Sequence, residues 1–317
     1  MIHIKQIILI SLIGLFIGCA VDPPIYSTGN CDQVVIDSQM HPCIITNFAE
    51  GPIQYKAPFF NPIDSSEFVY IEINHDSGYS RLCTFNYVTH QKQILKTDVD
   101  DEVQPKWNIN NKIIFGVNSK IYLINSNGTG FQQLTFNGLD FWPEWINTDT
   151  ICFTDNNSGI GASLSITLNH LDTITLSPLV LASVSSNKII ATTNGSRDAP
   201  DIIISDIDSL NWKLLPVNTF NSGYDRIEGI SWHPNNFQIY YTKYTLGIFM
   251  VDILDEKFTQ VVSGCFGAWY KFIDISPQGN KIIAEKIITD YENCTYFLNS
   301  SIVLMNIDGS GEETILP

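Results

Sequence analysis

Basic side chains are scarce in this sequence. Only 17 Lys and Arg stand against 33 Asp and Glu among 317 residues, which gives a formal net charge of −16 at pH 7. Proteins that bind nucleic acids or anionic lipid surfaces need clustered Lys and Arg to neutralise phosphates. The composition therefore argues against a nucleic-acid partner. It favours a cationic partner or a divalent metal, although colloidal solubility alone also explains an acidic surface.

Catalytic sequence motifs are absent as well. The chain contains no G-x-S-x-G elbow, no H-E-x-x-H zinc motif and no phosphate-binding P-loop. Its six histidines are scattered and form no ligand spacing: His3, His41, His75, His90, His170 and His233. These absences predict a protein without catalytic residues, metal ligands or a bound cofactor.

No hydrophobic run reaches the length of a membrane span. The longest apolar run, residues 7–17, follows Lys5 and has the length of a signal-peptide core, short of the ~20 residues that cross a bilayer. Residues 16–19, with the sequence FIGC, resemble a bacterial lipobox that has Phe16 where Leu is usual. We predict a signal peptide at 1–18, a lipidated Cys19 and a tether at 19–42. An ordinary signal peptide cleaved nearby is the alternative, and both predict export to the cell envelope.

A repeat of about 43 residues fills the remainder of the chain. Short β-branched and aromatic runs, cut by Asn and Gly turns, recur behind six equivalent positions whose spacing ranges from 38 to 49 residues: Phe60, Trp107, Trp145, Ser183, Trp232 and Ile275. Each unit also has a strand that ends in Asn or Asp and a short apolar strand after it. A four-stranded propeller blade takes ~40–45 residues. The sequence thus predicts an all-β, six-bladed β-propeller of four-stranded antiparallel blades over 43–317, with a β-sandwich as the alternative.

Two segments compete for the role of the closing strand. Residues 44–48 and residues 313–316 both have the pattern of the last strand in a blade. We expect one of them to complete the final blade and the other to form a fifth strand or to lie free.

The repeat resembles a known family. The segments QLT, PEW and IYLINSNGTG in residues 121–145 are similar to the WD40-like propeller repeat of the TolB type, and the likeness extends over 44–317. It is weakest in the fourth unit, where Ser183 replaces Trp. The family's W-S-P-D-G turn appears as WHPNN at 232–236 and ISPQG at 275–279, which makes His233 a turn residue. No α/β domain precedes the repeat as it does in TolB, so a role in the Tol system is not implied.

Six cysteines remain beside Cys19. Cys31 in the predicted tether is separated by 11 residues from Cys43 at the start of the propeller, and Cys265 lies between the fifth and sixth units while Cys294 lies in an insertion of the sixth. These four are candidates for disulfides in an exported protein. Cys83 and Cys152 fall on predicted strands, where we expect buried free thiols. The sequence leaves the pairing open.

Acidic and aromatic side chains gather in the connections between units. The densest acidic run precedes the second unit, and equivalent connections carry further acids and aromatics: Asp98, Asp100, Asp101, Glu102, Asp140, Trp142, Tyr224, Asp225 and Trp269. In a propeller these connections surround one mouth of the central channel. Aromatic platforms beside carboxylates suit sugars, peptides or cationic protein segments. The acidic run also has the oxygen ligands that Ca²⁺ prefers, although a solvated loop explains it equally.

These features predict a non-catalytic, lipid-anchored envelope protein that binds a protein or peptide at the channel mouth, with no membrane contact beyond the anchor. The alternative is a carbohydrate-active or metal-dependent enzyme. Oligogalacturonate lyases also resemble the repeat and use several His around a metal, and the scarcity of His argues against that activity here. A purely structural assembly factor is a third possibility.

Overall fold

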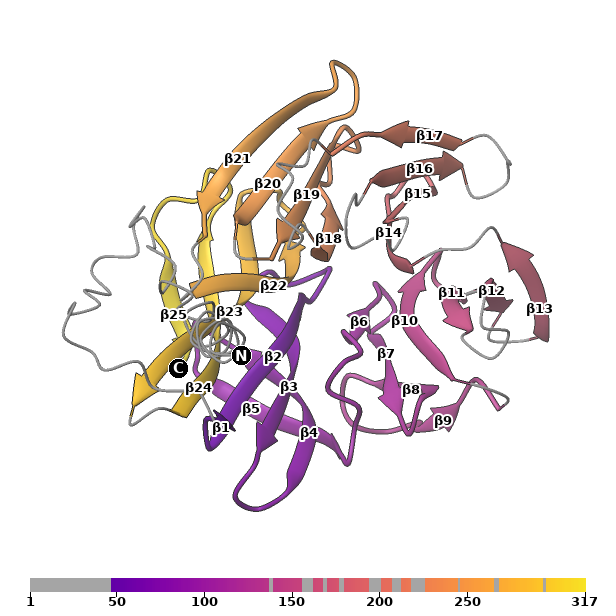
Figure 1. Ribbon diagram of the computed structural model, residues 1–317. Coiled ribbons are helices and arrows are strands. Elements are labelled where there is room, and N and C mark those ends of the chain that lie inside the picture. The colour runs from indigo at the N-terminus through magenta and orange to yellow at the C-terminus, as the bar shows by residue number, and fades with distance from the viewer. Residues whose placement is uncertain are drawn as a thin grey trace, which may run out of the picture.

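The computed structural model describes residues 47–136, 139–155, 162–167, 170–176, 180–193, 201–206, 212–217, 226–244, 246–264, 268–292 and 295–317. These residues form 25 strands arranged in six sheets around a central axis (Figure 1). The predicted six-bladed propeller is therefore confirmed. No helix in the described part of the chain is long and apolar enough to cross a bilayer.

Five blades are four-stranded meanders whose first strand lies innermost. Blade 1 comprises β2 (Ile53–Phe60), β3 (Glu67–Asn74), β4 (Tyr79–Asn86) and β5 (Gln91–Thr97), and blade 2 comprises β6 (Lys106–Trp107), β7 (Lys112–Val117), β8 (Lys120–Asn125) and β9 (Gln132–Gln133). Blade 3 comprises β10 (Asp140–Trp145), β11 (Thr150–Asp155), β12 (Ala162–Thr167) and β13 (His170–Leu176). Blade 4 comprises β14 (Val180–Val184), β15 (Ile189–Thr193), β16 (Ile202–Asp206) and β17 (Trp212–Leu215), and blade 5 comprises β18 (Ile227–Trp232), β19 (Gln238–Lys243), β20 (Gly247–Asp252) and β21 (Lys257–Ser263).

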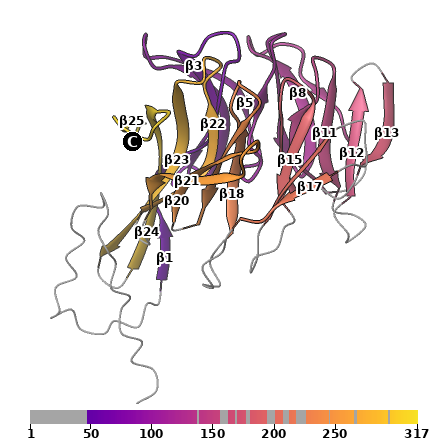
Figure 2. The ribbon, with the colours of Figure 1, turned by 90° about the horizontal axis from the view of Figure 1, so that it is seen from above.

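Blade 6 accommodates both candidate closing strands. It comprises β22 (Ala268–Ile275), β23 (Lys281–Glu292), β24 (Thr295–Asn306) and β25 (Glu313–Leu316), and it also includes β1 (Asn47–Glu50). Strand β25 pairs antiparallel with the second half of β24, whereas β1 pairs in parallel with its first half. The expectation that one of the two segments completes the blade is met by β25. The other does not resemble an outer blade strand, because β1 runs parallel and extends an arm of blade 6 beyond the disc (Figure 2).

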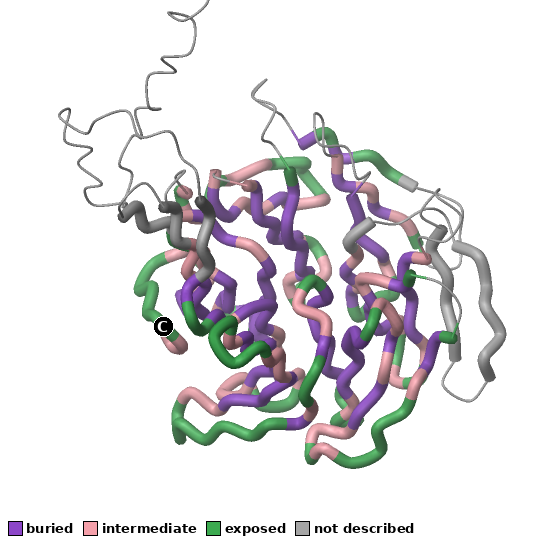
Figure 3. The backbone as a smooth tube through the Cα atoms, turned by 60° about the horizontal axis from the view of Figure 1, so that its bottom comes forward, coloured by how far each residue is buried: buried purple, intermediate pink, exposed green. Residues whose placement is uncertain are grey.

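The hydrophobic core lies between the blades. Each main cluster joins two neighbouring sheets: Val69 and Phe115 contribute to the cluster between blades 1 and 2, and Phe68 and Leu304 to the one between blades 1 and 6. The second strand of a blade is buried on both faces, while outer strands such as β5 are largely exposed. Figure 3 shows this gradient from buried inner strands to exposed turns and outer edges.

The six repeat positions fall at or next to the carboxyl end of an inner strand. Two of the tryptophans join adjacent blades: Trp145 Nε1 donates to the Lys106 carbonyl at 3.0 Å, and Trp232 Nε1 donates to the Ser183 carbonyl at 3.1 Å. The equivalent Trp107 is 3% exposed and its Nε1 has no acceptor among the described residues. The same position thus serves the same packing role with unequal hydrogen bonding.

The structure describes two of the seven cysteines, the two that were predicted to be free thiols. Cys83 and Cys152 are buried and unpaired, which confirms that prediction. Cys19, Cys31, Cys43, Cys265 and Cys294 lie outside the described residues. Lipidation and the two candidate disulfides therefore stay predictions.

The unequal bonding of the tryptophans leads to a stability prediction. Trp145→Phe removes the donor to a buried carbonyl, whereas Trp107→Phe removes a donor that has no acceptor. Leaving a buried acceptor unsatisfied costs about 1–3 kcal/mol, so we expect Trp145→Phe to lower the free energy of unfolding by about 1 kcal/mol more than Trp107→Phe. Urea unfolding of the two variants measures the difference. Equal losses would contradict the proposed role of the indole hydrogen bond.

Candidate functional site

In every blade the residue directly before the repeat position lines the channel. Side chains alternate along a strand, so the residue directly before each repeat position turns to the axis. We call these six residues the axial ring: Phe59, Lys106, Glu144, Ala182, Ser231 and Asp274. All six border one of two cavities on the axis. The ring is mostly polar, and it contains three ionisable groups.

The two cavities differ greatly in size. The one nearer the start of the inner strands, which we call the mouth, measures about 10 Å³ and is bordered by residues such as Gln104, Trp142 and Phe272. That space suits roughly one water molecule. The other, which we call the axial cavity, measures about 180 Å³ and lies where the inner strands end. The channel is therefore nearly closed on the side where sequence analysis placed the site and wider on the opposite side.

Opposite charges meet in the axial ring. Lys106 Nζ lies 2.9 Å from Glu144 Oε2, and both side chains are under 10% exposed at 6% and 7%. Lys106 Nζ also lies 4.6 Å from the centre of the Phe59 ring. Burial raises the pKa of Glu144, and the Lys106 ammonium opposes this rise. The ion pair joins blade 2 to blade 3.

Asp274 is the second buried carboxylate of the ring. It accepts hydrogen bonds from Ser231 Oγ and from the Phe60 backbone N–H, both at 2.9 Å. Burial raises its pKa to about 6, against the opposing effect of Lys106 and of these hydrogen bonds. Asp274 thus connects blade 6 to blades 5 and 1 and stays close to its titration point near neutral pH.

The acidic run before blade 2 does not form an open cluster of carboxylates. Asp100 accepts from the backbone N–H groups of Asn118 and Ser119 at 2.8 and 2.7 Å, which fixes the β7–β8 turn. Asp98 has a φ of 59°, and its carboxylate accepts from Thr97 Oγ1 at 3.2 Å. Two of the four predicted site carboxylates are thereby held in local loop structure.

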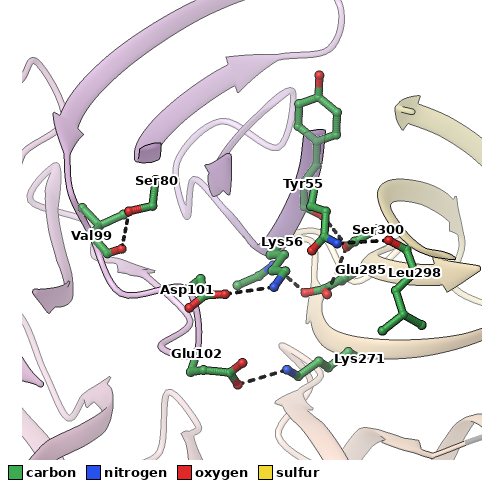
Figure 4. A network of polar contacts seen from close by, with 12 residues as sticks. Tyr55, Lys56, Ser80, Val99, Asp101, Glu102, Lys271, Glu285, Leu298 and Ser300 are labelled. Carbon is green, nitrogen blue, oxygen red and sulfur yellow. Dashed lines mark hydrogen bonds and ion pairs between the residues drawn. The ribbon is translucent and has the colours of Figure 1, made fainter. Parts of the chain in front are cut away.

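The other two carboxylates of the run pair with lysines from distant strands (Figure 4). Asp101 lies 2.9 Å from Lys56 Nζ on β2, and Glu102 lies 3.3 Å from Lys271 Nζ on β22. Burial alone would raise the pKa of Asp101, but the charge and hydrogen bond of Lys56, a backbone hydrogen bond and the charge of Lys271 together hold that pKa below the usual range. Among the described residues no three His, Cys, Asp or Glu gather to hold a metal ion. The carboxylates that a Ca²⁺ ion would need from this run already have hydrogen-bond or ion-pair partners within the protein.

Sequence reasoning missed the partners of these acids. Lys56, Lys271 and Glu228 each stand four residues before a repeat position, so the repeat itself places them at the same level of the channel wall. Glu285 on β23 was missed too: it accepts from the Ala57 backbone N–H at 2.9 Å and from Ser300 Oγ at 3.1 Å. Burial raises the pKa of Glu285. Comparing residues by repeat position, and not only by local charge, would have identified the lysines.

The remaining predicted site residues are dispersed. Asp140 is 1% exposed and burial raises its pKa, while Trp269 is 7% exposed and packs edge-on against Tyr244 with ring centres 5.1 Å apart. Trp142 is half-buried and borders the mouth. Tyr224 and Asp225 lie outside the described residues. Of the described aromatic candidates, the structure places Trp142 at the channel.

Comparison with known proteins identifies the class of fold. No protein-family model matches the chain, and no curated protein sequence matches it. Among solved structures, a putative TolB from Agrobacterium tumefaciens is similar with a TM-score of 0.55 and 16% identity, over 73% of this chain and 86% of that one. TolB from Acinetobacter baumannii is similar with a TM-score of 0.53 and 11% identity, over 84% of this chain and 69% of that one. An oligogalacturonate lyase in complex with manganese is similar with a TM-score of 0.55 and 10% identity, over 83% of this chain and 77% of that one. The chain has the β-propeller fold of the TolB-type structures.

The buried carboxylates predict how stability depends on pH. The pKa of Asp274 is about 6 in the folded protein, above the ordinary value of 3.8 expected in the unfolded chain. Its contribution to the free energy of unfolding is therefore present at low pH and is lost as the pH rises through 6. We expect the free energy of unfolding to increase by about 1 kcal/mol between about pH 7.5 and about pH 5.5 from this group alone. The raised pKa values of Glu144 and Glu285 act in the same direction.

Urea unfolding across this pH range tests the expectation. Asp274→Asn should flatten the pH profile, because the variant lacks the titrating group. A wild-type profile that falls toward pH 5.5, or an unchanged slope in Asp274→Asn, would show that Asp274 does not dominate the linkage.

Proposed function

We propose that this protein is a non-catalytic propeller of the bacterial cell envelope, anchored through a lipidated Cys19, that binds a protein or peptide on the mouth face of the ring. The proposal builds on the predicted export signal, on the TolB-type fold and on the chemistry of the mouth. Because the mouth holds only about 10 Å³, a partner would lie across this face and would not enter the channel from it.

Trp142 is the observation that carries the proposal. It sits in a register break of β10 between Phe141 and Glu144, and its φ is 49°, in a region that bulky residues rarely adopt. Bulges re-aim side chains next to functional sites, and such backbone strain concentrates there. Blade 1 has the same backbone form at Ala57, with a φ of 54° and complete burial. The equivalent positions of other blades hold side chains from Gly229 to Phe272, so the repeat accommodates different sizes there, and Trp142 contributes an aromatic surface to the mouth.

Charged pairs lie on the same side of the ring as this aromatic surface. Asp101 with Lys56 and Glu102 with Lys271 lie on the same side of the ring, where inner strands begin. Such pairs present donors and acceptors of both signs and suit the polar main chain and mixed side chains of a peptide. The mouth differs in this respect from the acidic rim that the sequence predicted.

A carbohydrate-active enzyme is the second candidate. The observation in its favour is that Glu144 and Asp274, both with raised pKa, border the same axial cavity. Paired carboxylates with perturbed pKa are typical of acid–base sites. Turnover of polygalacturonate by the wild type, abolished in Asp274→Asn, would favour this function over the proposed one.

Substitution of Trp142 tests the proposed binding face. We expect Trp142→Ala to reduce capture of the envelope partner by the lipid-free protein at least tenfold, since an aromatic anchor at an interface is worth ~2 kcal/mol or more. Quantitative pull-down from envelope extracts measures the loss. Val88→Ala is the control and should leave capture unchanged, because Val88 lies in the β4–β5 turn and is 66% exposed. Equal capture by all three proteins would place the binding surface elsewhere.

The anchor has its own test. Expressed in a bacterial host, the wild type should incorporate labelled palmitate and remain with the membrane fraction. Cys19→Ser should incorporate none and be released, while Cys31→Ser, the nearest other cysteine, should behave as the wild type. Labelling that survives Cys19→Ser would refute the lipobox.

A further inference from the structure

The connection between blades 2 and 3 exposes apolar side chains on the mouth side of the ring. Phe136 and Leu139 are 59% and 49% exposed. At the start of β10 the side chains alternate, so Asp140 is buried, whereas Leu139 before it and the half-buried Phe141 after it share the outward face. The rings of Phe141 and Trp142 have centres 6.1 Å apart. An apolar strip of Phe136, Leu139 and Phe141 therefore leads from Trp142 away from the channel.

One residue holds the acidic run beside the apolar strip. Ser119, in the β7–β8 turn, donates its backbone N–H to Asp100 Oδ2 at 2.7 Å. Its carbonyl accepts the backbone N–H of Asp140 at 3.0 Å. Asp100 belongs to the connection between blades 1 and 2, and Asp140 begins β10. The two connections are thus fixed next to each other on the mouth face, with the β7–β8 turn between them.

The acidic run turns its carboxylates to solvent and its lysine partners inward (Figure 4). The Lys56 side chain is 11% exposed and that of Asp101 is 40% exposed, while the corresponding values for Lys271 and Glu102 are 20% and 69%. Asp98 is exposed as well. A molecule that approaches this part of the mouth therefore meets carboxylates first. Such a surface attracts basic side chains.

The other charged groups of the mouth restrict where a basic side chain can bind. Arg226, next to β18 of blade 5, reverses the arrangement, because its side chain is 52% exposed and that of its partner Glu228 is 4% exposed. Lys120 is half-buried, and its charge opposes the rise that burial causes in the pKa of Asp140. A basic side chain is consequently favoured over the connection between blades 1 and 2 and repelled over blade 5.

We propose that the apolar strip and the acidic run together bind a protein segment that carries Lys or Arg beside large apolar side chains. The apolar side chains pack on Leu139 and its neighbours in the strip, and the basic ones pair with Asp98 and Glu102. This partner chemistry rests on the proposed function, because the strip continues the binding face at Trp142. Apolar patches rimmed by polar residues are typical of interaction surfaces. An anionic membrane would bring its phosphates against the same carboxylates, which favours a protein segment over a lipid surface.

Random peptides displayed on phage, selected on the lipid-free protein, supply a defined probe. We expect the enriched peptides to combine Lys or Arg with large apolar residues. A synthetic copy of the most enriched peptide should bind about tenfold more weakly, or worse, to Leu139→Ser and to the double variant Asp98→Asn, Glu102→Gln. Asn tolerates the left-handed backbone at position 98, so the double variant removes charge without strain. Raising NaCl from about 50 to about 500 mM should weaken binding several-fold, since salt screens exposed charges.

Matched controls come from the β20–β21 turn on the opposite face. Leu254→Ser, at a position that is 71% exposed, and Asp255→Asn should bind the peptide as the wild type does. Failure to enrich any peptide, enriched peptides without basic residues, or wild-type affinity in Leu139→Ser would overturn the proposal. Sedimentation with vesicles of phosphatidylethanolamine and phosphatidylglycerol that is lost in Leu139→Ser would identify a membrane contact instead.

Capture of the envelope partner separates this proposal from the function on which it rests. Loss of capture in Trp142→Ala with full capture by Leu139→Ser and by the double charge variant would leave the mouth as the binding face and refute the partner chemistry. Full capture by all of these variants would refute both.

Discussion

The structure depends on hydrogen bonds that join the inner edge of blade 6 to blade 1. A ring of wedges is stable only when its last member packs on its first, and the two are far apart in sequence. Asp274 accepts the backbone N–H of Phe60, and Glu285 accepts that of Ala57, across 214 and 228 residues. Ala57 lies in the register break of β2 between Lys56 and Phe59, and Phe60 lies just beyond the break, in register with Phe68 of β3. Two buried carboxylates thus satisfy backbone donors of the innermost strand of blade 1, and closure follows.

The same constraint explains why the channel is ionic and yet nearly closed at the mouth. Register breaks recur in the inner strands of five blades, and they direct additional side chains toward the axis. Large residues such as Trp142 and Phe272 then fill the space near the start of the strands. Beyond the bulges the channel widens to about 180 Å³. The two faces of the ring consequently offer different chemistry.

The repeat allowed the fold to be predicted from the sequence, but it did not predict which charged side chains of the site pair with one another. Asn86, Asn125 and Asp252 each end a third strand, because turn-forming side chains act locally and their spacing can be read directly. The acidic run has no such local signal. Asp101 meets a lysine 45 residues away and Glu102 one 169 residues away, so proximity arises only when the ring closes. The burial of Asp140 and Trp269 likewise follows from blade packing and not from neighbouring residues.

The attachment of the amino-terminal segment separates the two faces further. Strand β23 runs antiparallel to β22, and its last four residues continue past the start of β22. The arm built by β23, β24 and β1 therefore projects from the mouth side, and the chain joins the ring there at Asn47. A lipid on Cys19 would be connected to that side through 28 residues, at most ~100 Å of extended chain. A partner on the mouth face would lie beside the tether, whereas the axial cavity lies toward the opposite end of the inner strands. The proposed binding face and the attachment of the tether therefore share one side of the ring.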